Sequence, residues 1–159
     1  MTAPVRVLVA HNRYRSALPS GENTVVDTEV EGLRARGVEV ELLLAESDDI
    51  ADFGLGAKLA LPLRPTWSAT TRRRFHALVA EHRPDVVHLH NPFPLLSPMV
   101  VRWAKDADLP VVQSVHNVRH ACLAGTWFRE GGDCRECAGH RWSGPGVRHG
   151  CHTLSLIHI

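Results

Sequence analysis

The sequence predicts an α/β fold with a doubly wound parallel sheet, and three observations support this. Short apolar segments with the character of buried strands alternate with segments whose apolar residues recur at helical spacing. Glycine or proline separates most of these segments, as at Gly37 and Pro84. Three of the expected strands end in the same His-Asn pair. Alternation of this kind is typical of a sheet whose parallel strands are joined by right-handed helical crossovers.

The composition is that of one globular domain. The chain has 159 residues, of which 44% are hydrophobic and 22% charged, enough to bury about two-thirds of the unfolded surface. A formal net charge of +1 argues against nucleic acid as a partner, since phosphate-binding proteins carry a large basic excess. No apolar stretch reaches membrane-spanning length, and the first ten residues lack the sections of a secretion signal. We therefore expect a cytoplasmic protein.

The first third of the chain reads as strand, loop, helix and strand. Residues 5–10 form an apolar strand, and the loop after it contains Gly21 just before a helical pattern over 22–36. Gly37 is the expected stop of this helix. Residues 38–44 form a second strand whose first half alternates apolar and acidic side chains. This alternation predicts a strand near the edge of the sheet.

The middle of the chain is less regular. Within residues 45–68, Asp48 and Asp49 can begin a short helix, whereas the glycines and prolines that follow prevent a long one. Thr70 or Thr71 is the expected cap of the next helix. That helix carries its apolar residues at helical spacing and ends before Pro84.

The last expected elements are two strands with a helix between them. Residues 86–89 are a buried strand, and Ser97 followed by Pro98 predicts the start of a helix. Residues 110–115 form the fourth strand. Residues 119–152 are rich in glycine, cysteine and histidine and show no strand pattern, so we expect a loop-rich segment there.

Polar side chains end three of the strands. Because the carboxyl ends of parallel strands meet at one edge of a sheet, where ligands bind in such folds, we expect these side chains to converge there. Imidazole and carboxamide groups donate and accept hydrogen bonds, which suits a ligand with many hydroxyl groups. The competing interpretation is that each residue only caps the backbone of its own loop. The residues are His11, Asn12, His90, Asn91, His116 and Asn117.

The order and spacing of several motifs resemble the amino-terminal domain of family 4 glycosyltransferases. The motifs are VRVLVAHNRY, a PSGEN loop that begins a helix, RPDVVHLHN, LPVVQSVHN and a cysteine-bearing stretch, CLAGTWFREGGDCREC, that resembles one in a bacterial subset of the family. The resemblance covers about residues 5–153 and implies a retaining enzyme of the GT-B fold, of which this chain is the Rossmann-like amino-terminal half. It also implies an acceptor that is a glycan, a lipid or a small molecule, and no catalytic metal.

The resemblance also implies roles for single residues. Gly21 with Glu22 matches the glycine-rich loop that lies against the donor phosphates and the acceptor, although Ser20-Gly21 stands here for the usual double glycine. His116 matches the histidine that contacts the transferred sugar, and Asn117 matches its frequent Asp or Asn neighbour. These residues are the expected catalytic and substrate-binding residues of this half.

His90 and Asn91 lie on the same rim and are expected to meet the acceptor.

Other parts of such enzymes are not found in this sequence. The resemblance implies that a second Rossmann-like domain with a spaced pair of glutamates holds the nucleotide-sugar donor. We therefore interpret residues 1–153 as one domain of a longer enzyme, whose association with a membrane surface stays open. Residues 154–159 read LSLIHI, which a common library adapter encodes, and we interpret them as a sequencing scar.

Four cysteines fall within thirty residues of a chain that otherwise has none. Cys134 and Cys137 have the C-x-x-C spacing of tetrahedral zinc ligands, and Cys122 and Cys151 flank them. We expect a structural zinc ion; free thiols lining a substrate loop and a redox-active pair are the alternatives. Histidines that could replace a cysteine as ligand are His120, His140, His149 and His152.

Two other functions stay open at this point. A nucleotide-sugar epimerase built on the same scaffold would need an acid and a base in the cleft, and no suitable carboxylates stand out in this half. A zinc-stabilised binding module without catalysis would bind sugar or nucleotide by itself. The fold does not decide between these functions, since function resides in the site.

Overall fold

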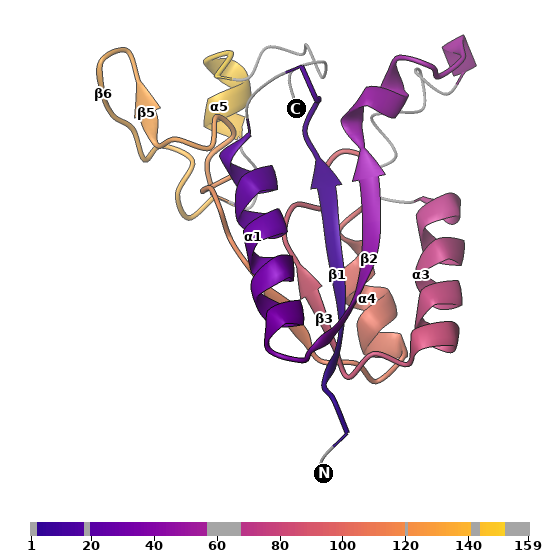
Figure 1. Ribbon diagram of the computed structural model, residues 1–159. Coiled ribbons are helices and arrows are strands. Elements are labelled where there is room, and N and C mark those ends of the chain that lie inside the picture. Colours follow the sequence, from indigo (N-terminus) through magenta and orange to yellow (C-terminus); the bar gives the residue numbers. More distant parts are fainter. Residues whose placement is uncertain (1–2, 18–19, 57–67, 120, 141–143, 152–159) are drawn as a thin grey trace. The chain divides into compact units, whose positions relative to one another are not determined.

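The computed structural model describes residues 3–17, 20–56, 68–119, 121–140 and 144–151 (Figure 1). The chain forms two units, Met1–Ser114 and Val115–His158. The expected scar at residues 154–159 lies outside the described residues. No helix among the described residues has both the length and the apolar character that a membrane crossing requires.

The first unit is built on a parallel sheet of four strands in the order β2-β1-β3-β4. Val9 of β1 pairs with Leu42 of β2 on one side and with His88 of β3 on the other. β2 is therefore an edge strand, as its alternating pattern predicted. The strands are β1 (Arg6–Arg13), β2 (Glu39–Glu46), β3 (Val86–Leu89) and β4 (Val111–Gln113).

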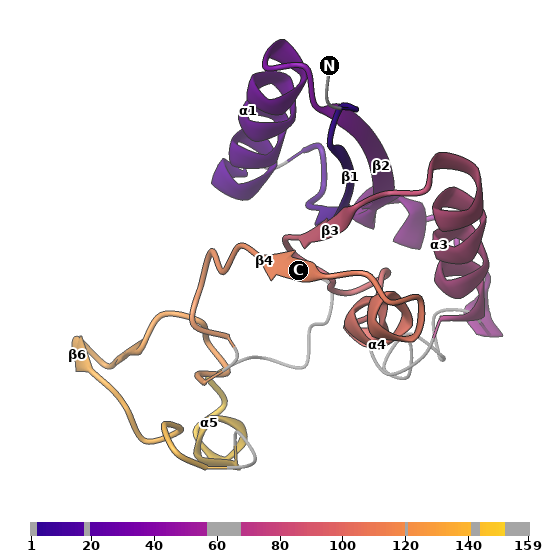
Figure 2. The same ribbon diagram turned by 90° about the horizontal axis from the view of Figure 1, so that it is seen from below.

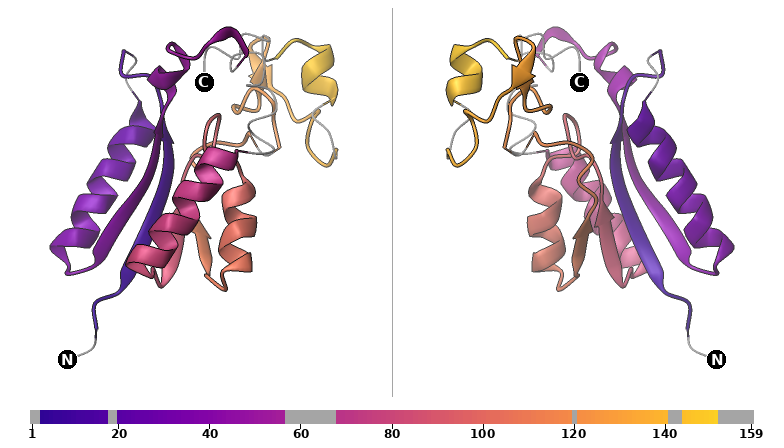
Figure 3. Two further views of the ribbon diagram at one scale, coloured as in Figure 1. Left: turned by 90° about the vertical axis from the view of Figure 1, so that its right-hand side faces the viewer. Right: turned by 90° about the vertical axis from the view of Figure 1, so that its left-hand side faces the viewer.

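Helices cover both faces of this sheet, which confirms the doubly wound α/β fold. Helix α1 (Gly21–Ala35) lies on one face, and α3 (Ala69–His82) and α4 (Met99–Asp106) lie on the other (Figures 2 and 3). The α1 face encloses a small valine core, because each of its strands directs alternate residues to the same side. The buried members of this core are Val7, Val9, Val26, Val30 and Val40.

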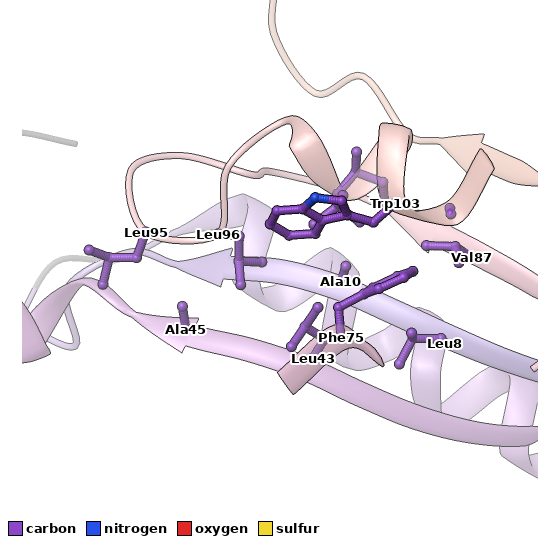
Figure 4. Packing of buried hydrophobic residues seen from close by; sticks show 12 residues of the cluster. Leu8, Ala10, Leu43, Ala45, Phe75, Val87, Leu95, Leu96 and Trp103 are labelled. Atoms are coloured by element: carbon purple, nitrogen blue, oxygen red, sulfur yellow. The ribbon is translucent and has the colours of Figure 1, made fainter. Parts of the chain in front are cut away.

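The larger core lies between the sheet and the other two helices (Figure 4). Phe75 of α3 is completely buried, and the centroid of its ring lies 6.1 Å from the ring centroid of Trp103 on α4. Leu8 and Leu43 meet these rings from the sheet. Leu96 belongs to the loop before α4 and joins the same core, so this loop is fixed by apolar packing as well as by hydrogen bonds.

Serine side chains cap two of the helices. The hydroxyl of Ser20 accepts a hydrogen bond from the N–H of Asn23 at the start of α1. The hydroxyl of Ser68 does the same for Thr71 at the start of α3. The prediction that Thr70 or Thr71 caps α3 was wrong, because the helix begins two residues earlier and its first turn already includes both threonines.

The end of β1 also differs from the prediction. β1 continues through Arg13, so the first His-Asn pair lies inside the strand and not in the loop after Ala10. Pairing with β2 extends the strand, since Arg13 is still matched with Glu46. The predicted short helix is present as the 3-10 helix η1 (Ser47–Ile50).

The second unit contains little regular structure. A two-stranded antiparallel hairpin joins β5 (Phe128–Arg129) to β6 (Gly132–Asp133), and α5 spans Gly144–Arg148. The loop-rich segment that the sequence predicted therefore also contains a short hairpin. Gly131 in its turn has a φ of +85°, a conformation that glycine adopts without steric cost. Two-residue strands are too short to show a periodicity, so no strand pattern was detectable there.

The carboxylate of Asp85 connects the start of β3 to β1. Its hydrogen bonds make the stability of the fold depend on pH. The carboxylate accepts hydrogen bonds from the backbone N–H of Arg6, at 2.8 Å, and from the guanidinium of the same residue. These bonds hold the pKa of Asp85 below its ordinary value. A carboxyl with a lowered folded-state pKa stabilises the fold above its unfolded pKa, and this contribution disappears as the pH falls through the folded pKa.

We therefore expect Asp85→Asn to lower the urea midpoint at pH 7. The difference from the unchanged protein should shrink as the pH falls below about 4. Urea unfolding followed by circular dichroism between pH 7 and pH 3 measures this, with the exposed Asp106→Asn as a control for carboxylate removal. A difference that stays constant over this pH range would contradict the assignment.

Candidate functional site

The carboxyl end of β1 carries His11, which is completely buried. Its Nε2 atom lies 3.0 Å from Oδ1 of Asn23 in the first turn of α1. The ring also makes an edge contact with that of His90, with 6.0 Å between ring centroids. His11 therefore connects β1, β3 and the amino end of α1, the three elements that form this part of the rim.

Asn12 holds the loops at the rim together. Its Oδ1 accepts from the N–H of Leu95 at 2.9 Å, and its Nδ2 donates to Oγ of Ser47 at 2.9 Å and to the carbonyl of Arg13 at 3.0 Å. Its backbone N–H donates to the carbonyl of Asn91 at 2.7 Å. Both amide hydrogens are thus used within the protein, so the geometry supports a structural role for Asn12.

Asn91 differs from Asn12 in having a donor to spare. Its Oδ1 accepts from the N–H of Phe93 at 3.1 Å, which closes a tight turn after β3. Its Nδ2 is buried and has no hydrogen-bond partner among the described residues. A buried donor without a partner is costly, which makes Asn91 the better candidate for a ligand contact.

The glycine loop leaves open space at its first helical residue. A Cβ added to Gly21 would meet no atom within 4 Å, and the residue is exposed. Neither packing nor backbone conformation within the protein requires glycine at this position. Glu22 follows it and is half-buried.

Arg13 carries the positive charge nearest this end of β1. Its guanidinium binds Asp27 of α1 and lies 3.7 Å from Oε1 of Glu46. The hydrogen bond that Arg13 donates to Asp27 is the main cause that raises the pKa of Arg13. This charge is therefore already neutralised by the protein.

The structure brings two of the three predicted pairs together. His11-Asn12 and His90-Asn91 lie side by side, as the bond between the backbones of Asn12 and Asn91 shows. His116 and Asn117 belong to the second unit, so their convergence with the other pairs remains a prediction. Within that unit Oδ1 of Asn117 accepts from the N–H of Arg119 at 3.1 Å.

A group of possible metal ligands that the sequence analysis did not identify lies beside this rim. Glu29 of α1, with His88 and His90, places one donor atom from each residue within 4.8 Å of the others. His88 lies on β3 and His90 directly follows its last residue, so the two histidines stand two apart and face the same side of the sheet. This H-x-H spacing was visible in the sequence, but nothing there showed which helical carboxylate would reach it.

The four cysteines line one small cavity of the second unit, with a volume of about 10 Å³. The pKa of the Cys122 thiol is raised by burial but lowered by the backbone N–H groups of residues 124–127, and the result lies below its ordinary value. No described cysteine belongs to a group of three donors that all lie within 4.8 Å of one another. The predicted ligands therefore share a cavity without forming a closed metal site.

Comparison with known proteins gives one family. The profile of the glycosyl transferase 4-like domain matches residues 20–155. Searches of curated proteins and of solved structures found no match. The matched range begins at the cap of α1 and includes β3, β4 and all four cysteines.

The hydrogen bonds of Asn12 predict a stability effect. Asn12→Ala removes the partners of a buried N–H and a buried hydroxyl, and we expect it to reduce the free energy of unfolding by about 1–3 kcal/mol. Chemical denaturation measures this against Thr28→Ala, an exposed change on α1. An equal, small effect of both variants would show that the Asn12 amide does not hold the rim.

Proposed function

The chain belongs to the glycosyl transferase 4-like domain family, and from this premise we propose that it is the acceptor-side half of a retaining glycosyltransferase. Its enzyme would move a sugar, of the hexose class, from a nucleotide sugar to a glycan, a lipid or a small molecule in the cytoplasm. The family match over residues 20–155 is the observation that carries this proposal. The rim of His11, Asn12, His90 and Asn91 supplies the place for the acceptor.

The described groups suit a polyhydroxylated acceptor. The Nδ2 donor of Asn91 is available for a hydroxyl oxygen, and the open space at Gly21 allows a ligand to approach the backbone of α1. The amino end of α1 favours an anionic group such as a donor phosphate. Glu22, adjacent to Gly21, would meet the acceptor hydroxyls.

His116 would orient the transferred sugar and would not act as a nucleophile. Asn117 would support the loop that carries it, since the amide of Asn117 binds the backbone two residues on. The departing phosphate would be stabilised by cationic groups and helix-end dipoles directed at the developing charge. A second domain would provide most of the donor contacts, and its closure would exclude water. We therefore expect no turnover from the 159 residues alone.

Two experiments test the proposed function: sequencing of the source DNA, and kinetic measurements on the enzyme that it encodes. We expect the source DNA to continue past the codon for Thr153 into a second α/β domain with a spaced glutamate pair. In that enzyme His116→Ala should lower kcat about a hundredfold, because a sugar held in the wrong orientation reacts slowly. Transfer of labelled sugar, measured with separate kcat and KM values, checks this.

The exposed His76→Ala on α3 is the matched control, and it should keep full activity. An unchanged kcat in His116→Ala would contradict the role of this histidine. A stop codon directly after Ile159, together with sugar or nucleotide binding by the chain alone in calorimetry, would instead support the binding-module function.

We also propose that Cys122, Cys134, Cys137 and Cys151 bind a structural zinc ion. The cavity that they line has room for about one small ion. The N–H groups around Cys122 stabilise a thiolate, which is the form that binds zinc. Zinc would cross-link a unit whose described residues form one hairpin and one short helix.

Charged groups near the cavity complement such a site. The guanidinium of Arg129 lies 2.7 Å from the carboxylate of Glu136, and its interaction with the Cys134 side chain helps to raise the pKa of Arg129. Glu136 also lies 2.9 Å from Nε2 of His149. A positive group against the sulfur would offset part of the excess negative charge of four thiolates around one zinc ion.

We expect Cys134→Ser to abolish the thiolate-to-metal absorption of the cobalt-substituted protein. The melting temperature of the zinc form should also fall, since bound metal contributes folding energy. Absorption spectroscopy and thermal unfolding measure the two effects, with the exposed Asp133→Asn as control. Absence of any thiolate-to-cobalt band in the unchanged protein would exclude the site and leave free thiols or a redox pair.

A further inference from the structure

Glu29, His88 and His90 form a compact group on the α1 face of the first unit. Oε1 of Glu29 lies 3.2 Å from Nδ1 of His88, and Oε2 lies 3.7 Å from Nε2 of His90. The two imidazole rings lie 4.2 Å apart between centroids and are tilted by 38°. One carboxylate from a helix therefore faces one nitrogen of a histidine on β3 and one nitrogen of a histidine just after this strand.

Ser114 fixes the orientation of one of these rings. Nε2 of His88 lies 2.9 Å from Oγ of Ser114, so the ring can donate its proton to this hydroxyl. The Nδ1 atom then presents a lone pair toward Glu29. Metal-binding histidines commonly have such a partner on their second nitrogen, which sets the tautomer and holds the ring.

An ionised carboxylate has no hydrogen to donate, and a neutral imidazole nitrogen with a lone pair has none either. In this tautomer a cation, either a proton on the ring or a metal ion, brings Nδ1 of His88 and the carboxylate of Glu29 together; in the other tautomer Nδ1–H donates to Glu29 directly. The separation of 3.7 Å between Glu29 and His90 is longer than a direct hydrogen bond. The donor atoms leave a gap that a shared cation would fill.

From this arrangement we propose that Glu29, His88 and His90 bind a divalent transition-metal ion of the zinc class. Two imidazole nitrogens and one carboxylate oxygen favour such ions over magnesium or calcium, which prefer oxygen ligands. Three protein ligands leave a coordination position for water or for a ligand oxygen. This proposal does not depend on the proposed function and shares no residue with the cysteine cavity.

The burial of the three side chains is consistent with an ion that enters from one side. The side chains of His88 and His90 are 10% and 1% exposed, whereas that of Glu29 is 36% exposed. The carboxylate thus lies at the surface and the imidazoles lie beneath it. A bound ion would connect α1 directly to β3, next to Asn91 at the rim.

Cobalt(II) titration of the 159-residue chain tests this proposal, because cobalt distinguishes the two kinds of ligand. Binding at nitrogen and oxygen gives d–d absorption without the thiolate charge-transfer band that cysteine ligands add. We expect Glu29→Gln to weaken the thiolate-free site at least tenfold and to leave any thiolate band unchanged. Glu31→Gln, an exposed change on the same helix, should bind as the unchanged protein does.

NMR of the histidine ring nitrogens supplies a second measurement. A purely structural role of these histidines would give no change in their signals on addition of zinc. We expect zinc to shift the ring nitrogens of His88 and His90 and to leave those of the exposed His76 in place. Unchanged cobalt affinity in Glu29→Gln would overturn the proposal. Ring signals of His88 and His90 that respond to pH and not to zinc would also overturn it, and would identify a proton as the shared cation.

Discussion

The rim of the first unit depends on one buried amide. Asn12 stands near the end of β1 and binds the η1 segment through Ser47 and the loop after β3 through Leu95. A carboxamide is suited to this because it donates and accepts at adjacent atoms. Parallel strands deliver their loops to one edge but do not fix them there, so a bond that crosses from loop to loop is required.

The two asparagines of this rim differ in how their side-chain amides are used. The side chains of His11 and Asn12 form hydrogen bonds with α1, with η1 and with the loop before α4. The first pair thus holds the loops of the rim together, whereas Asn91 of the second pair has a buried donor that no described residue uses. Two identical His-Asn motifs differ in this way because different groups of the protein surround them at the ends of neighbouring strands.

The fold was predictable because its signals are periodic and repeated. Alternating strands and helices, Gly37 and Pro84 define the doubly wound sheet without any contact information. The exact ends were less predictable: β1 runs on to Arg13 because β2 continues beside it, and Ser68 caps α3 before the threonines. Pairing partners and cap geometry are set in three dimensions, and composition does not encode them locally.

The site was predictable only in part, for a related reason. The strand ends placed His11 and His90 at one edge, as expected. The approach of Glu29 to His88 depends on how α1 crosses the sheet, which no spacing of letters specifies. The shared cavity of the four cysteines followed from their density in the chain. The family match adds what neither composition nor geometry supplies, the class of reaction.

The strand order also determines how this protein must emerge from the ribosome. β1 pairs on one side with β3, and Arg6 meets Asp85, which lies 79 positions further along the chain. At translation rates of about 5–20 residues per second, this edge of β1 waits on the order of 4–16 s for its partner. During that time the nascent chain exposes an apolar strand edge, so its early folding competes with aggregation. β2 precedes β3 in the chain and pairs with the other edge of β1, so that edge finds its partner earlier.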